Sequence, residues 1–163
     1  MGRSGASSQA DCARRDHPFW LATRNAESAA QLKASGLRIT GVGGAVSIAV
    51  NEVAPMSNYS SQDAFELIVL ATKAQAAIDS APTLAQLLAP GGKLLPIQNG
   101  GVSQILAQQL GSERVLGGLS NLGATMTTLG HYEQRNAGHL LIRRARAATA
   151  SARRESERGS GAP

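Results

Sequence analysis

The sequence predicts an α/β fold in which helices connect the strands of an open, mostly parallel sheet. Strand-like and helix-like segments alternate between residues 18 and 142, the pattern that crossover connections between parallel strands produce. Residues 67–71 form a continuous apolar run of strand length, which is typical of a strand buried on both faces. Glycine, proline and asparagine separate the apolar segments, as expected at turns.

In the first half of this region, residues 26–35 are predicted to form a helix that ends at Gly36. A short strand is predicted before it, at 19–23. The sequence after Gly36 predicts strands at 37–40 and 45–50 around a glycine turn, and alternation of Val46, Ile48 and Val50 supports the second. Residues 54–62 are predicted to form a loop from their composition.

In the second half, helices are predicted on either side of Pro82, because proline interrupts the helical hydrogen-bond pattern. Apolar residues at helical spacing predict a further helix over 102–110. The remaining segments are predicted to be strands. The predicted elements are the strand 67–71, the helices 74–80 and 83–88, the strand 93–97, the helix 102–110, the strand 115–119 and looser strand material up to 142.

The length of 163 residues predicts one domain, and a hydrophobic content of 42% with only 3% aromatic residues predicts an aliphatic core. No apolar run is long enough for a membrane span, and no secretory signal is recognisable. The single cysteine, Cys12, excludes an intramolecular disulfide and any multi-cysteine metal site. We therefore expect a reducing, cytoplasmic setting.

The formal net charge of +5 resides at the ends of the chain. Positive and negative side chains balance over residues 21–142, so we do not expect a folded nucleic-acid-binding face. Residues 1–17 are an atypical N-terminal segment without helical or strand periodicity. Residues 143–163 are rich in arginine and contain no large apolar side chain, which predicts a disordered tail.

The glycine-rich segments do not match a phosphate-binding loop. Gly41 to Val46 resembles a dinucleotide-binding fingerprint, but a strand-like sequence follows it and a helix N-terminus is needed there. We interpret this segment as a hairpin-like turn. The segment Gly91-Gly92-Lys93 lacks the residues that a phosphate-binding loop requires at the neighbouring positions.

Polar residues follow several predicted strands, where open parallel sheets bind their ligands. Lys73 follows the apolar strand and suits a phosphate or carboxylate, although a surface lysine at a helix start is the simpler interpretation. Asn99 could cap the next helix or contact a ligand. Arg24 follows the first recognisable strand and is either a solvated charge or a partner for a ribose 2′-phosphate.

Residues 21–142 resemble the N-terminal nucleotide-binding domain of the ketopantoate reductase (2-dehydropantoate 2-reductase) family. The order and spacing of several short segments carry the resemblance. These segments are Leu21 to Arg24, Leu32 to Ile39, Phe65 to Gln75, Gln98 to Gly100, Arg114 to Gly118 and Gly123 to Thr125. The resemblance implies a Rossmann-like, doubly wound domain over residues 18–142.

The family reduces ketopantoate, a 2-keto acid, to pantoate with NADPH, a step towards coenzyme A. By resemblance, Arg24 would meet the 2′-phosphate of NADPH and Lys73 would lie in the cofactor crevice. Asn99 would contact both cofactor and substrate, and Ala124 would line the nicotinamide side. The matching segments also place Gln75 and Gly100 among the cofactor-binding residues.

The ends of the chain depart from the family pattern. Residues 1–17 show neither the first strand nor the glycine loop, and residues 143–163 stand where a C-terminal helical domain with the catalytic lysine would begin. We therefore assign no catalytic residue and expect a cofactor-domain fragment that is inactive alone, poorly stable and prone to self-association through exposed sheet edges. Frameshifted or misassembled coding sequence would explain both ends, and reading the gene in its other frames tests this.

The alternative hypothesis is a non-enzymatic, degraded α/β module whose basic tail binds an acidic partner or nucleic acid. The arginines of residues 143–163 support it, whereas the tail has no aromatic residue for base stacking. Salt dependence would discriminate the two hypotheses, because phosphate contacts weaken steeply with ionic strength.

Overall fold

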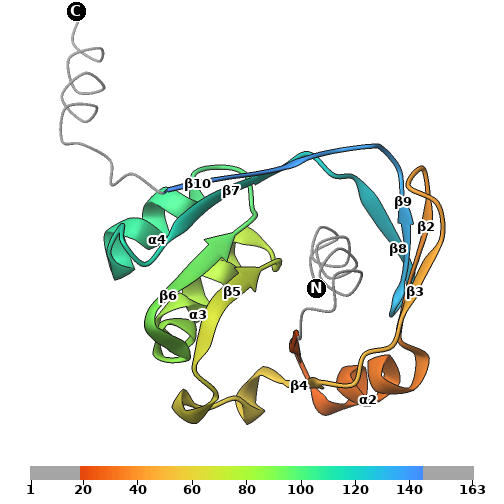
Figure 1. The fold of residues 1–163 in the computed structure, drawn as a ribbon, viewed down its shortest axis with the longest axis horizontal. Coiled ribbons are helices and arrows are strands. Elements are labelled where there is room, and N and C mark those ends of the chain that lie inside the picture. Colours follow the sequence, from red (N-terminus) through yellow and green to blue (C-terminus); the bar gives the residue numbers. More distant parts are fainter. Residues whose placement is uncertain (1–18, 145–163) are drawn as a thin grey trace, which may run out of the picture.

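The structure, a computed structural model, describes residues 19–144 and contains three α-helices, two 3-10 turns and ten strands in that range (Figure 1). The first half of this range contains β1 (Leu21–Thr23), α2 (Ala26–Ser35), β2 (Leu37–Gly41), β3 (Val46–Ile48), β4 (Val53–Pro55), the 3-10 turns Met56–Asn58 and Ser61–Asp63, and β5 (Phe65–Leu70). The second half contains α3 (Ala74–Gln86), β6 (Leu88–Pro96), α4 (Val102–Leu110), β7 (Leu116–Ser120), β8 (Ala124–Thr128), β9 (His131–Gln134) and β10 (Leu140–Arg144).

The strands form four hydrogen-bonded groups rather than one continuous sheet. Strand β1 pairs with β4 and strand β5 with β6, both in parallel, while β7 pairs with β10 in the antiparallel sense. The fourth group has the order β3-β2-β9-β8 and contains the parallel pair β2–β9. The α/β class is confirmed, and three of the strand groups contain a parallel pair.

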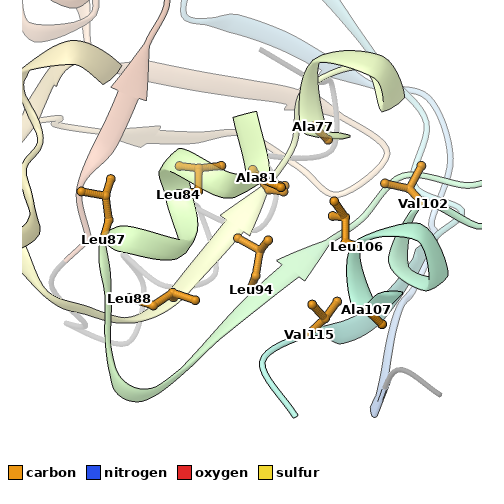
Figure 2. Close-up of a cluster of buried hydrophobic side chains, with 11 residues drawn as sticks. Ala77, Ala81, Leu84, Leu87, Leu88, Leu94, Val102, Leu106, Ala107 and Val115 are labelled. Carbon is orange, nitrogen blue, oxygen red and sulfur yellow. The ribbon is translucent and has the colours of Figure 1, made fainter. Parts of the chain in front are cut away.

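Two hydrophobic clusters hold these groups together. The first lies between α3, α4 and the β5–β6 pair, and Figure 2 shows its leucines, alanines and valines converging from both helices and the strand. The second joins α2 to β1, β2, β3 and β9, with Leu32 and Leu37 almost completely buried. Both clusters are aliphatic apart from Tyr132 and a few partly buried aromatic rings, as the composition predicts.

Strand β5 differs from the prediction that it is buried on both faces. Ile68 and Leu70 face the first cluster, but Leu67 is 50% exposed and Val69 is 39% exposed. Successive side chains of a strand point to opposite faces, so the described residues cover only the face that α3 packs against. In addition, β1 pairs only with β4 and β5 only with β6 among residues 19–144. The predicted self-association rests on these edges and stays a prediction.

Three local predictions need correction. The two helices predicted around Pro82 are a single helix, α3, because Ala81 and Leu84 are buried in the first cluster on both sides of the proline. The predicted loop, 54–62, overlaps the end of strand β4, in which Val53 pairs with Leu21 and Pro55 takes the last ladder position. Strand β6 begins at Leu88, earlier than the predicted residue 93, because Phe65 pairs with Leu88.

Other local predictions are confirmed. Helix α2 has the predicted bounds, with Asn25 as N-cap and Gly36 at its end with a φ of 67°. Strands β2 and β3 pair antiparallel around Gly41 to Val46, which confirms the hairpin-like turn. Strand β10 extends to Arg144, two residues into the segment predicted as a tail. The predictions for residues 1–17 and for 145–163 lie outside the described residues.

Tyr59 connects the β1–β4 pair to the β5–β6 pair. We expect it to make the folded state less stable at alkaline pH. Its hydroxyl donates to the Leu21 carbonyl at 3.3 Å and its ring packs edge-on against Phe65 at 5.8 Å. Burial is the main cause that raises the pKa of Tyr59 above its usual value of 10.0. The unfolded chain therefore releases the phenolic proton first, and the stability contributed by Tyr59 is lost as the pH rises above about 10.

Urea unfolding at pH 8 to 11 checks this expectation. The free energy of unfolding of the Tyr59→Phe variant should be about 1 kcal/mol lower than that of the wild type at pH 8, because the hydrogen bond to Leu21 is lost. Above pH 10, the stability of this variant should fall less steeply than that of the wild type. Burial also raises the pKa of Tyr132, so Tyr132→Phe serves as the comparison variant. Parallel pH profiles for the wild type and Tyr59→Phe would contradict the assignment.

Candidate functional site

The parallel pair β5–β6 brings two of the predicted residues to one edge. The ladder ends where Leu70 pairs with Pro96. A short turn then leads from β5 to α3 and another leads from β6 to α4. Lys73 stands in the first turn and Asn99 in the second. Carboxyl ends of adjacent parallel strands share one edge of a sheet, and ligands of open α/β sheets bind there.

Gln98 fastens this edge together. Its Nε2 donates to the Leu70 carbonyl at 3.0 Å and to the Thr72 carbonyl at 2.9 Å, which links the turn after β6 to the turn after β5. Its Oε1 is buried and has no hydrogen-bond partner among residues 19–144. The site predictions did not include Gln98, although its place directly after a buried strand and beside Asn99 was a usable signal.

Lys73 occupies the N-cap position of α3 without a capping side-chain bond. Its backbone carbonyl accepts from Ala77 at 2.9 Å, while its side chain is exposed. The lysine charge and the positive end of the α3 dipole at this turn both attract an anion.

Asn99 does not cap α4. The N-cap residue is Gly101, without a side-chain hydrogen bond, and the Gly101 carbonyl accepts from Gln104 and Ile105. Gly100 and Gly101 have φ values of 86° and 79°, a conformation that favours glycine. These two residues separate Asn99 from the first residue of α4. The capping alternative is therefore wrong. The exposed Asn99 side chain leaves the ligand contact as the prediction that stands.

Arg24 lies at the carboxyl end of β1, in the parallel pair β1–β4. It is exposed between Thr23, whose buried hydroxyl donates to the Asn25 carbonyl at 2.9 Å, and Asn25, whose Oδ1 accepts from the Ser28 amide at 2.9 Å. These bonds fix the backbone that carries the guanidinium group. Strands β1 and β5 approach each other at their amino ends, where the rings of Trp20 and Phe65 are 5.6 Å apart.

The remaining predicted residues are placed differently. Gln75 lies on the exposed side of α3, and its Nε2 already donates to Asp79 Oδ1 at 2.8 Å. Ala124 is 7% exposed and begins β8, opposite Gln134 of β9. The structure thus gathers Lys73, Asn99 and Gly100 around Gln98, and places Arg24 and Ala124 on other strand groups.

Residues 19–144 contain no group of three or more histidine, cysteine or acidic side chains that could hold a metal ion. None of the helices in that range combines the length and the apolar character that crossing a membrane requires.

Comparison with known proteins gives one family match. The sequence model described as ketopantoate reductase PanE/ApbA matches residues 5–146, which is most of the chain and includes much of the atypical N-terminal segment. A search of curated proteins found no significant match.

Several solved structures share the fold. A D-mandelate dehydrogenase in complex with NADH and anilino(oxo)acetate superposes with a TM-score of 0.74 at 21% identity, covering 96% of this chain and 50% of its own. The 2-dehydropantoate 2-reductase of Geobacter metallireducens GS-15 superposes with a TM-score of 0.68 at 20% identity, covering 94% of this chain and 50% of its own. The 2-dehydropantoate 2-reductase of Methylococcus capsulatus superposes with a TM-score of 0.67 at 22% identity, covering 87% of this chain and 46% of its own. This chain therefore spans about half the length of these proteins and matches their Rossmann-like N-terminal domain.

Proposed function

Since the chain belongs to the ketopantoate reductase PanE/ApbA family, we propose that residues 19–144 bind NADPH for the reduction of a 2-keto acid, with ketopantoate as the substrate. The D-mandelate dehydrogenase that shares the fold was solved with NADH, which supports a nicotinamide dinucleotide as the ligand class. The preference for NADPH over NADH rests on Arg24.

The edge held by Gln98 is the observation that carries this proposal. It places the exposed Lys73 ammonium and the exposed Asn99 carboxamide after two adjacent parallel strands, at the edge where open α/β sheets bind nucleotides. A dinucleotide offers phosphate oxygens to Lys73 and amide and hydroxyl groups to Asn99. The residues present therefore fit the cofactor. No glycine loop is recognisable among them, so the pyrophosphate would rely on Lys73 and the first turn of α3.

Each residue has a separate task in this proposal. The Arg24 guanidinium would pair with the 2′-phosphate, a group that NADH lacks. Asn99 would orient the cofactor and the substrate with its carboxamide, and Ala124 would leave space at the nicotinamide side. The reduced nicotinamide supplies a hydride when it is bound. Gln98 would hold the turns that carry Lys73 and Asn99 in register.

The reduction also needs a proton for the oxygen of the keto group. The family resemblance places the lysine that donates this proton in a C-terminal helical domain, outside the matched segments. We therefore propose that residues 19–144 supply the cofactor edge and one substrate contact, and that the proton comes from outside this range. Its setting in the cell is proposed to be the cytoplasm.

Thermal unfolding of the full chain with NADPH and with NADH tests the proposal. A nucleotide that binds only the folded state adds RT ln(1 + [L]/Kd), or about 2.7 kcal/mol at a hundredfold excess over Kd. NADPH should raise the midpoint more than NADH does. Arg24→Gln should abolish this difference, and Asn99→Ala should lower the effect of both nucleotides.

The matched control is Lys33→Gln, which removes one exposed positive charge at the opposite end of α2 from Arg24. This variant should keep the NADPH preference. An unfolding midpoint that neither nucleotide moves would reject cofactor binding by this chain. A preference for NADPH that survives in Arg24→Gln would reject the role of Arg24 only.

A further inference from the structure

A polar hollow of about 200 Å³ lies on the four-stranded group, away from the edge held by Gln98. Its lining residues come from three neighbouring strands, β2, β9 and β8. They are Arg38, Thr40, Thr127, His131 and Tyr132. The side chains of Arg38, Thr40 and His131 can donate hydrogen bonds outward, while Tyr132 is 3% exposed and packs in the second hydrophobic cluster.

The strand register places the donors on one face. Arg38 pairs with His131 in the parallel β2–β9 ladder, so both side chains project from the same side of the sheet. Thr40 follows Arg38 on that side. The β8–β9 ladder shifts between Met126 and Thr128, and Thr127 is the extra residue in this irregularity, with its hydroxyl directed to the His131 carbonyl at 3.4 Å.

The charges around the hollow favour an anion. Within residues 19–144, no carboxylate lies within ion-pair distance of Arg38, since the ion pair found there joins Arg135 to Glu133 at 3.1 Å. Glu133 shares the outer face of β9 with His131, but Arg135 neutralises it. Strands β3 and β8 contribute no ionisable residue. Within residues 19–144, the Arg38 guanidinium beside the His131 imidazole therefore has no ion-pair partner.

We propose that this hollow binds a phosphate-type oxyanion. The guanidinium of Arg38 would donate to two of its oxygens, and the His131 imidazole and the Thr40 hydroxyl would complete its hydrogen bonds. The site is separate from the proposed cofactor edge, because His131 pairs near the end of β8 at Thr128, whereas Ala124 begins that strand opposite Gln134. It does not depend on the proposed cofactor role.

Titration of the full ¹⁵N-labelled chain with inorganic phosphate, at constant ionic strength, tests this site. Amide resonances of Arg38, Thr40 and His131 should shift together and give one dissociation constant, and Arg38→Gln should weaken it at least about tenfold. The second variant, His131→Asn, should weaken it less. A parallel titration with AMP shows whether the site also takes a phosphate carried by a nucleotide.

The matched control is Arg143→Gln, which removes an exposed arginine of β10 and should leave the dissociation constant unchanged. Since Arg38 is also exposed, its replacement leaves the core intact, and the far-UV circular dichroism of both variants should match the wild type. The proposal is overturned if phosphate shifts no resonance of β2 and β9, or if Arg38→Gln binds it as tightly as the wild type.

Discussion

Replacing Leu106 by alanine is expected to lower the free energy of unfolding by about 2–5 kcal/mol. Leu106 has no exposed surface and projects from α4 into the first hydrophobic cluster (Figure 2). Leu94 of β6 and Val115, just before β7, belong to the same cluster. Alanine there leaves a cavity that rigid helix and strand backbones cannot close. Domains of this size have a total stability of about 5–15 kcal/mol, so one such cavity removes a large share of it.

The neighbouring Ile105 provides the matched control. It lies on the same helix but is 39% exposed, so Ile105→Ala should cost about 1 kcal/mol or less. Urea unfolding followed by circular dichroism measures both variants. Equal losses would mean that α4 does not pack in the described orientation. Because α4 starts directly after Gly101, that result would also remove the support for the position of Asn99.

The elements that were predicted correctly carry their own local signals. Helix α2 begins where the Asn25 side chain accepts from the Ser28 amide and ends where Gly36 adopts a positive φ. Both signals act within a few residues and are readable in the sequence. The β2–β3 hairpin is similar, because alternation fixes the strands and glycines fix the turn.

The errors arise where distant contacts decide the structure. Pro82 is a strong local signal for a helix break, yet burial of Ala81 and Leu84 keeps α3 continuous. Val53 to Pro55 has a weak strand signal, and pairing with β1 makes it a strand. The exposure of Leu67 and Val69 depends on what covers β5, which an apolar run does not reveal.

The candidate site was predictable to the extent that strand ends are. Lys73 and Asn99 could be selected because each follows an apolar strand, and the parallel β5–β6 ladder places them at one edge. The capping alternative for Asn99 fails because two successive glycines with positive φ separate it from α4. The double hydrogen bond of Gln98 depends on the distance between two turns far apart in sequence, so only the structure reveals it.

Adding one methyl group to β7 should disturb both the fold and the edge at the ends of β5 and β6 that Gln98 links. A Cβ at Gly118 would lie 2.5 Å from the Pro96 carbonyl oxygen and 3.1 Å from the Ile97 side chain. The oxygen belongs to the β6 backbone and cannot rotate away, so β6 and β7 must separate. We expect Gly118→Ala to cost about 1–3 kcal/mol.

The adjacent Gly117→Ala variant tests whether the cause is this close approach. A Cβ at Gly117 would meet the Arg143 side chain at 3.5 Å, an ordinary contact, so that variant should stay within about 0.5 kcal/mol of the wild type. Thermal unfolding distinguishes the two glycines, and their equal behaviour would contradict the close packing of β7 on β6. Since Pro96 and Ile97 lead directly to Gln98, a displaced β6 should also loosen the hold of Gln98 on Leu70 and Thr72. Gly118→Ala should then weaken nucleotide binding beyond its effect on stability, whereas Gly117→Ala should leave binding unchanged.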